Sequence, residues 1–221
     1  MRHNIDIGAR QALIQIGKAG VTAHRADIER LRDEFSQRSC VHLRDLVESP
    51  LLSFVLASIE KGTWESHERH GFDSNCVLAP GPAVELLHFI MNWPGFLRVA
   101  HEITGCGPFT WFGGLVYRLL PEAGHYDSWH SDNTDGRLVA FSLNLSPRGY
   151  SGGLLQLRDR NSDTLLADIA NTGLGDALMF RISPNLLHQV TRVEGTEPKT
   201  AFAGWFTATD PTFANRLRNS S

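Results

Sequence analysis

The pattern of short apolar segments after residue 107 constrains the fold of this 221-residue chain more than any other feature. Short apolar or alternating segments are separated by clusters of Gly, Pro, Asn and Asp, at intervals of roughly 8–12 residues. Such spacing is typical of an all-β sandwich or barrel. The expected strands cover residues 110–120, 137–145, 153–157, 165–169, 177–181, 188–193 and 200–207.

The first half of the chain has a helical pattern instead. Apolar residues recur three and four positions apart, and the expected helices cover residues 26–35, 51–61, 82–91 and 94–104. Ser49 is the expected N-cap of the second helix, with Pro50 at its first position. The apolar faces of these helices need a partner, and a sheet is the obvious one.

We therefore expect an α+β protein that is mainly β. Residues 1–107 are predicted to form a helical support region, and residues 108–210 a β core within the same compact unit. Residues 211–221 are predicted to form a surface tail.

Composition and charge argue against several functional classes. The net charge of -3 and the scattered basic residues argue against a nucleic-acid reader. The longest apolar segment, 51–59, is too short to span a bilayer, and the first residues lack the apolar core of a secretion signal. Cys40, Cys76 and Cys106 form no C-x-x-C pair, which favours a reducing compartment. We expect a cytoplasmic protein that binds neither nucleic acid nor membrane; the pattern indicates no oligomeric state.

A histidine and an aspartate stand two positions apart in His130-Ser131-Asp132, and His188 lies on a later expected strand. Side chains two apart on a strand face the same side, so the first two can converge, and His188 can join them from a neighbouring strand. Two imidazoles and one carboxylate form the facial triad of non-haem Fe(II) oxygenases. The H-x-D spacing alone is weak evidence, because a polar histidine at a strand end also produces it. A second H-x-D, formed by His125 and Asp127, stands five residues earlier.

The surrounding motifs strengthen the pattern. Gly152-Gly153-x-Leu155 precedes His188, and Lys199 is followed by Gly204-Trp205-Phe206. Over residues 110–207 this order and spacing resemble the Fe(II)/2-oxoglutarate-dependent dioxygenase superfamily, in particular its prolyl-4-hydroxylase-like branch. The resemblance implies a double-stranded β-helix, a jelly-roll or cupin-like core with N-terminal helices packed on one sheet.

The resemblance also assigns roles to residues. His130, Asp132 and His188 would be the iron ligands, and Lys199, six residues before Trp205, would bind the far carboxylate of 2-oxoglutarate. An ammonium inside the barrel is a suitable partner for one end of a dianionic diacid. Without the resemblance, Lys199 would be interpreted as a solvated turn lysine.

Two further residues are candidates for the 2-oxoglutarate pocket. Arg192 is the rival cation, because it stands four residues after His188 and shares its face on a regular strand. Relatives often have a tyrosine before a Leu-Asn pair, where this chain has Ser142. Tyr117 is the first candidate to supply that phenol and Tyr126 the second, although Tyr117 also fits a buried core position.

The implied activity is hydroxylation of an unactivated C–H bond, in a small molecule or a peptide or protein residue, with release of succinate and CO2. The implied cofactors are Fe(II), 2-oxoglutarate as co-substrate and O2, with ascorbate as a further candidate. Specificity is expected in two loops, residues 63–80 and 121–128. Two other classes stay open: a non-catalytic metal- or ligand-binding β-helix domain, and a zinc hydrolase that uses the same three ligands.

Overall fold

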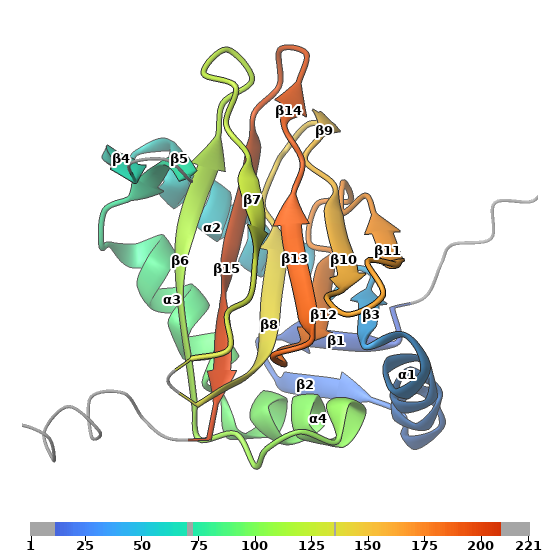
Figure 1. Ribbon diagram of the computed structural model, residues 1–221. Coiled ribbons are helices and arrows are strands. Elements are labelled where there is room, and N and C mark those ends of the chain that lie inside the picture. The colour runs from blue at the N-terminus through green and yellow to red at the C-terminus, as the bar shows by residue number, and fades with distance from the viewer. Residues whose placement is uncertain (1–11, 70–72, 135, 209–221) are drawn as a thin grey trace, which may run out of the picture.

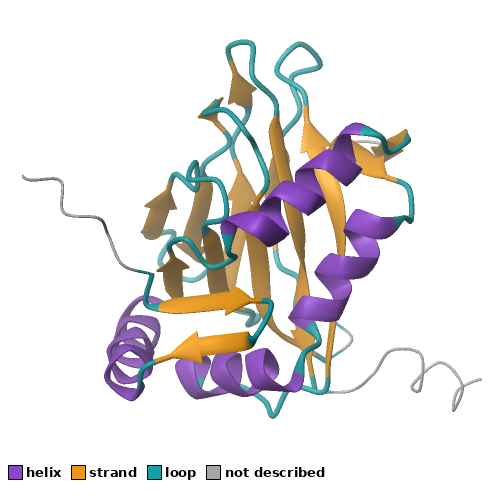
Figure 2. Ribbon diagram, turned by 180° about the vertical axis from the view of Figure 1, so that it is seen from behind, coloured by secondary structure: helices purple, strands orange, loops and turns teal. Residues whose placement is uncertain are grey.

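A single antiparallel sheet rolls into two facing layers at the centre of the fold, and helices cover one layer (Figures 1 and 2). The computed structural model describes residues 12–69, 73–134 and 136–208, so the predicted tail 211–221 lies outside the described residues. Within them the sheet has eleven strands, which is consistent with a double-stranded β-helix.

The first layer contains four strands. Their order is β11 (Leu165–Ile169), β10 (Leu155–Asp159), β13 (Leu186–Val190) and β7 (Asp127–His130). The second layer begins with β5, which pairs with β7 at one position and so joins the layers. Its order is β5 (Asp73–Leu78), β6 (Trp111–Leu119), β15 (Lys199–Thr207), β8 (Arg137–Asn144), β12 (Ala177–Arg181) and β3 (Cys40–Leu43), with β4 (Trp64–Arg69) paired to β5.

Side-chain alternation gives the second layer two different faces. On β8, Val139, Phe141 and Leu143 are buried on the helical side, and Ala140 packs on the opposite side, between the layers. The main core lies on the helical side, where the rings of Phe112 and Phe206 have centroids 4.8 Å apart. The helices that cover it are α1 (Arg25–Arg38), α2 (Ser49–Glu60), α3 (Pro82–Met91) and α4 (Pro94–Thr104).

The helix ends follow from local sequence. Helices α2, α3 and α4 each have a proline in the first turn, where the missing N–H costs no hydrogen bond. Gly105 ends α4 in the left-handed conformation, with a φ of 63°. The structure corrects one expectation, because Ser49 is the first residue of α2 and Glu48 takes the N-cap position.

The first half of the chain contributes strands as well as helices, which corrects its description as purely helical. Strand β3 forms the edge of the second layer beside β12. Strands β4 and β5 form a hairpin within residues 63–80, which we expected to be a loop.

Two small sheets of two strands each accompany the main sheet. In one, β1 (Ile14–Gly17) pairs with β2 (Gly20–Ala23), and in the other, β9 (Ser151–Gly152) pairs with β14 (Val193–Glu194).

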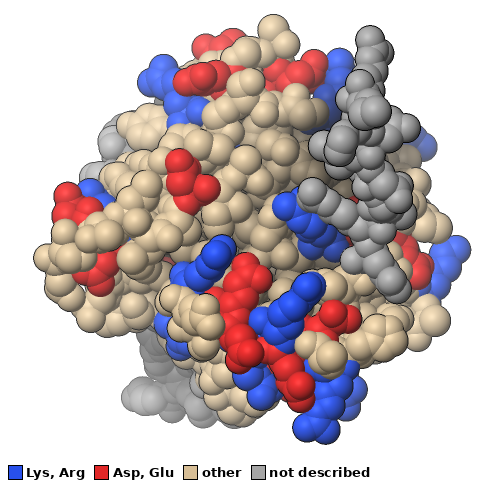
Figure 3. Space-filling model, turned by 90° about the vertical axis from the view of Figure 1, so that its right-hand side faces the viewer, with Lys and Arg blue, Asp and Glu red and all other residues tan. Residues whose placement is uncertain are grey.

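The surface carries charges of both signs. Figure 3 shows acidic and basic side chains close together on the face that includes α1, where Arg25 and Glu29 form an ion pair of 2.9 Å. Among the described helices, none has the length and apolar character needed to cross a bilayer.

Candidate metal centre

Two histidines face each other across neighbouring strands of the first layer. His130 on β7 and His188 on β13 are register partners, and their ring centroids lie 4.1 Å apart. Asp132 follows β7, with its Oδ1 3.5 Å from His130 Nε2 and its Oδ2 3.3 Å from His188 Nε2. The structure therefore brings together the three residues expected as metal ligands, with both Nε2 atoms directed at one carboxylate.

Residues from the second layer hold this carboxylate in place. Trp205 on β15 donates its indole N–H to Asp132 Oδ2 at 2.6 Å. The Arg137 guanidinium lies 3.4 Å from Asp132 Oδ1 and stacks 3.6 Å above the Trp205 ring. Asp132 thus connects the two layers.

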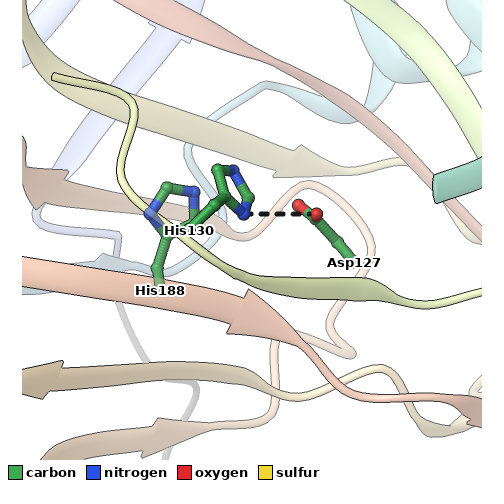
Figure 4. A group of neighbouring side chains, drawn as sticks. All are labelled: Asp127, His130 and His188. Atoms are coloured by element: carbon green, nitrogen blue, oxygen red, sulfur yellow. Dashed lines mark ion pairs between the residues drawn. The ribbon is translucent and has the colours of Figure 1, made fainter. Parts of the chain in front are cut away.

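A second carboxylate lies on the other side of His130. Asp127 Oδ1 is 3.3 Å from His130 Nδ1, and the Ser128 carbonyl oxygen is 2.7 Å from the same nitrogen (Figure 4). Asp127, His130 and His188 also place one ligand atom each within 4.8 Å of one another. However, a nitrogen that faces a carbonyl and a carboxylate must carry the proton and cannot ligate. The geometry therefore favours Asp132, which faces Nε2, as the third ligand.

Protonation states in this cluster depend on the shared carboxylate. Burial opposes charge on Asp132, but hydrogen bonds from His130, His188 and Trp205 outweigh it and hold its pKa well below the ordinary range. Burial also opposes charge on His130, yet the hydrogen bond to Asp132 and the charge of Asp127 raise its pKa to about 9. Burial lowers the pKa of His188, so this ring is neutral and needs to release no proton on binding a metal.

A cavity of about 430 Å³ opens between the layers at this cluster. Besides the triad, its lining includes Tyr117, Tyr126, Ser142, Lys199, Leu115 and Phe180. Leu115 and Tyr126 are 39% and 42% exposed, so they mark the solvent end of the cavity. Another hollow, of about 330 Å³, lies beside α2, away from the triad.

Lys199 lies at the buried end of the cavity and is only 4% exposed. Its ammonium donates to the Gly153 carbonyl at 2.7 Å and lies 5.7 Å from the Tyr150 ring centroid. Burial lowers the pKa of Lys199 to about 8, partly opposed by the charge of Asp127. The cavity thus has a cation that no described carboxylate contacts directly.

Tyr117 lines the same cavity from β6, the strand that pairs with the one carrying Lys199. Burial raises the pKa of its phenol, which therefore stays neutral, and its side chain hydrogen-bonds with that of Ser142. Tyr117 is the register partner of Ala201 on β15.

The structure does not bring Arg192 to the cavity, which corrects the expectation that it shares a face with His188. Strand β13 ends at Val190, so Arg192 lies in the connection to β14. Its side chain is exposed, and its guanidinium lies beside Gly124. His125, in contrast, is buried, and its Nδ1 accepts a hydrogen bond from the Leu120 backbone N–H at 3.1 Å, which is a turn contact.

Residues 114–207 match the family model described as the 2OG-Fe(II) oxygenase superfamily. The match covers the strands that carry the triad and Lys199, and it does not extend to the helical first part. Over its β core the chain is thus similar to this superfamily of enzymes, and the similarity implies Fe(II), 2-oxoglutarate and O2 as cofactors. None of the curated proteins compared with the chain matches its sequence.

Solved structures show the same fold. A Pseudomonas putida prolyl-4-hydroxylase is 16% identical, with a TM-score of 0.65 over 83% of this chain and 100% of that one. A Trichoplax adhaerens prolyl hydroxylase, in complex with a hypoxia inducible factor peptide, is 15% identical, with a TM-score of 0.59 over 85% and 94%. The non-haem α-ketoglutarate-dependent epimerase SnoN from nogalamycin biosynthesis is 14% identical, with a TM-score of 0.65 over 83% and 84%.

Proposed function

We propose that this protein is an Fe(II)- and 2-oxoglutarate-dependent dioxygenase that hydroxylates an unactivated C–H bond and releases succinate and CO2. The observation that carries the proposal is the buried ammonium of Lys199 in the same cavity as the His130, Asp132 and His188 cluster. A diacid that chelates a metal at one end needs a cation at the other. The first layer supplies the histidines for the metal, and the second layer supplies the Lys199 ammonium.

The proposed ligands of Fe(II) are His130 and His188, each through Nε2, and one oxygen of Asp132. Two nitrogens and one carboxylate oxygen suit Fe(II) and leave positions for reactants. Bound iron would supply the activation of dioxygen, and the chain supplies orientation. Trp205 and Arg137 hold Asp132. Related halogenases lack this carboxylate and have a halide in its place, so Asp132 supports oxygen insertion rather than halogenation.

Lys199 and Tyr117 are the proposed 2-oxoglutarate contacts. The ammonium pairs with the far carboxylate, and the neutral phenol donates a hydrogen bond to it. Because Arg192 lies outside the cavity, it has no part in the proposed pocket. Ascorbate remains a candidate reductant.

The substrate enters past Leu115 and Tyr126, at the exposed end of the cavity. An apolar and an aromatic side chain suit the C–H-rich part of a small molecule or a peptide, and one structural relative was solved with a peptide. All three cysteines carry free thiols, which suits the reducing cytoplasm. We propose no nucleic-acid or membrane partner.

The test is formation of succinate from 2-oxoglutarate in the presence of candidate substrates, under air and without oxygen. We expect succinate only with Fe(II) and oxygen, and label from isotopic dioxygen in the product. Asp132→Ala and Lys199→Met should abolish turnover while circular dichroism stays unchanged. Arg192→Met, which removes a cation outside the cavity, is the matched control and should keep full activity.

Three outcomes would contradict the proposal. Turnover without oxygen would favour a hydrolase, and binding of 2-oxoglutarate without succinate would favour a binding domain. Succinate formation with no label in the product would indicate a different oxidation, such as the epimerisation of the relative named above.

A further inference from the structure

We propose that Asp127 is a positioning residue that fixes the ring of His130 and thereby strengthens the metal site. This inference rests on the metal site of the proposed function. It assigns a role to an acidic residue that the ligand set leaves unused, on the strand that carries the first ligand.

An irregularity in β7 is what allows Asp127 to reach His130. On β13, His188 and Val190 are two residues apart, so both face the cavity. Their register partners on β7 are His130 and Asp127, which are three residues apart. In a regular strand, residues three apart face opposite sides. The extra residue forms a β-bulge, which turns both side chains into the cavity.

The contacts place Asp127 at the side of the His130 ring that points away from Asp132 and the proposed metal position. Its Oδ1 lies 3.3 Å from Nδ1, and the Ser128 carbonyl, inside the bulge, lies 2.7 Å from the same atom. Both are acceptors, so Nδ1 keeps its proton, and Nε2, which points toward Asp132, is the nitrogen that can bind a metal. A carboxylate that accepts from the N–H of a metal-binding histidine is a recurrent arrangement in proteins, and it fixes the orientation of the ring.

The Asp127 carboxylate adds a full negative charge, which the neutral Ser128 carbonyl does not have. A full negative charge beside Nδ1–H increases the electron donation of the ring toward a cation at Nε2. Asp127 is also only 30% exposed, so solvent screens this charge partially. The carbonyl fixes the ring plane, and Asp127 adds its charge along the same N–H.

The test is equilibrium binding of Mn(II), which needs neither 2-oxoglutarate nor turnover. We expect Asp127→Ala to weaken Mn(II) binding by roughly 10–100-fold, the range typical when a residue that hydrogen-bonds to a metal ligand is lost. Asp127→Asn, whose amide oxygen can still accept from Nδ1–H, should weaken it less. Asp168→Asn removes an exposed acid from β11 and is the matched control, with binding unchanged.

Two results would overturn the inference. Asp127→Ala affinity within about twofold of the wild type would show that the carboxylate does not support the ring. Loss of binding as complete as in His130→Ala, with an altered Co(II) absorption spectrum, would show that Asp127 is itself a ligand. Retention of the wild-type Co(II) spectrum in Asp127→Asn supports positioning, since the ligand set is then unchanged.

These failures differ from a failure of the proposed function. If the wild-type protein binds no Mn(II), the metal site itself is wrong. If the wild type binds Mn(II) and only the Asp127 variants behave differently from expectation, the inference fails and the oxygenase proposal stands. Melting temperatures of all variants exclude misfolding as the cause.

Discussion

At the scale of the residue, Lys199 combines a functional advantage with an energetic cost. A lysine with a pKa of about 8 resists carrying its charge in the folded protein. Relative to an ordinary lysine this costs on the order of 3 kcal/mol at neutral pH, before its hydrogen bond to Gly153 is counted. A buried cation kept at such cost is well suited to bind an anion.

The first prediction concerns the affinity for 2-oxoglutarate as a function of pH. Below about pH 8 Lys199 is charged, so the affinity should be constant. Above it the neutral amine must take up a proton to bind the dianion, so the dissociation constant should rise up to about tenfold per pH unit. Calorimetric titration with a redox-inert metal bound measures this dependence. Lys199→Arg stays charged throughout and should show no such rise. If the dissociation constant of the wild type stayed constant up to pH 10, roughly two units above the pKa of Lys199, Lys199 would be excluded as the partner.

Some residues of the site could be predicted from sequence and others could not. Strand alternation is enough to place His130 and Asp132 together, and the structure brings them within 3.5 Å. Arg192 was misplaced because its face depends on where β13 ends. Asp127 needs the bulge in β7, and a one-residue irregularity leaves no trace in the apolar pattern.

At the scale of the element, β6 and β15 approach each other through glycines. Gly204 on β15 pairs with Gly114 on β6. A Cβ added at Gly204 would overlap the carbonyl oxygen of Gly113 and the Cα of Gly114. This close approach places Trp205 one residue further along β15, where it holds Asp132.

The second prediction is that Gly204→Ala destabilises the protein. The added methyl group must push β6 and β15 apart, and overpacking of this kind costs typically about 1–3 kcal/mol. Thermal unfolding should show a melting temperature lower by roughly 3–10 °C. Gly149→Ala is the matched control, because no atom lies within 4 Å of its added Cβ, and its melting temperature should not change. Equal melting temperatures for both variants would disprove the close packing.

The elements differ in how clearly the sequence marks them. Helices α3 and α4 begin at proline and match their predicted bounds, because proline and glycine act through local geometry. Strands β4 and β5 were missed, since WESHER and DSNCVL have no apolar alternation. Strand β5 also pairs with β6, a partner distant in sequence.

At the scale of the whole molecule, the proposed ligands connect the two layers. The histidines belong to the first layer, whereas Lys199 belongs to the second. A metal chelated by 2-oxoglutarate would therefore join both layers through one bound assembly.

The third prediction is a cooperative thermal shift. Mn(II) at 100 times its dissociation constant should stabilise the protein by about 2.7 kcal/mol, or roughly 5–10 °C, and a chelator should reverse the shift. 2-Oxoglutarate should add a further shift only when the metal is present. His188→Ala should lose both shifts, and Lys199→Met should lose only the second. A full 2-oxoglutarate shift without metal would contradict chelation.

The buried end of the cavity, at Lys199, bears on the order in which co-substrate and substrate bind. A small apolar cluster lies at this end, formed by Leu119, Tyr150, Val190 and Val193. The Tyr150 hydroxyl donates a hydrogen bond to the Asn171 carbonyl oxygen at 2.6 Å. In the proposed pocket, a diacid bound to Lys199 would lie at this buried end, and the substrate would lie between it and the exposed Leu115 and Tyr126. The proposed arrangement therefore predicts that the diacid binds before the substrate and that succinate leaves after the product.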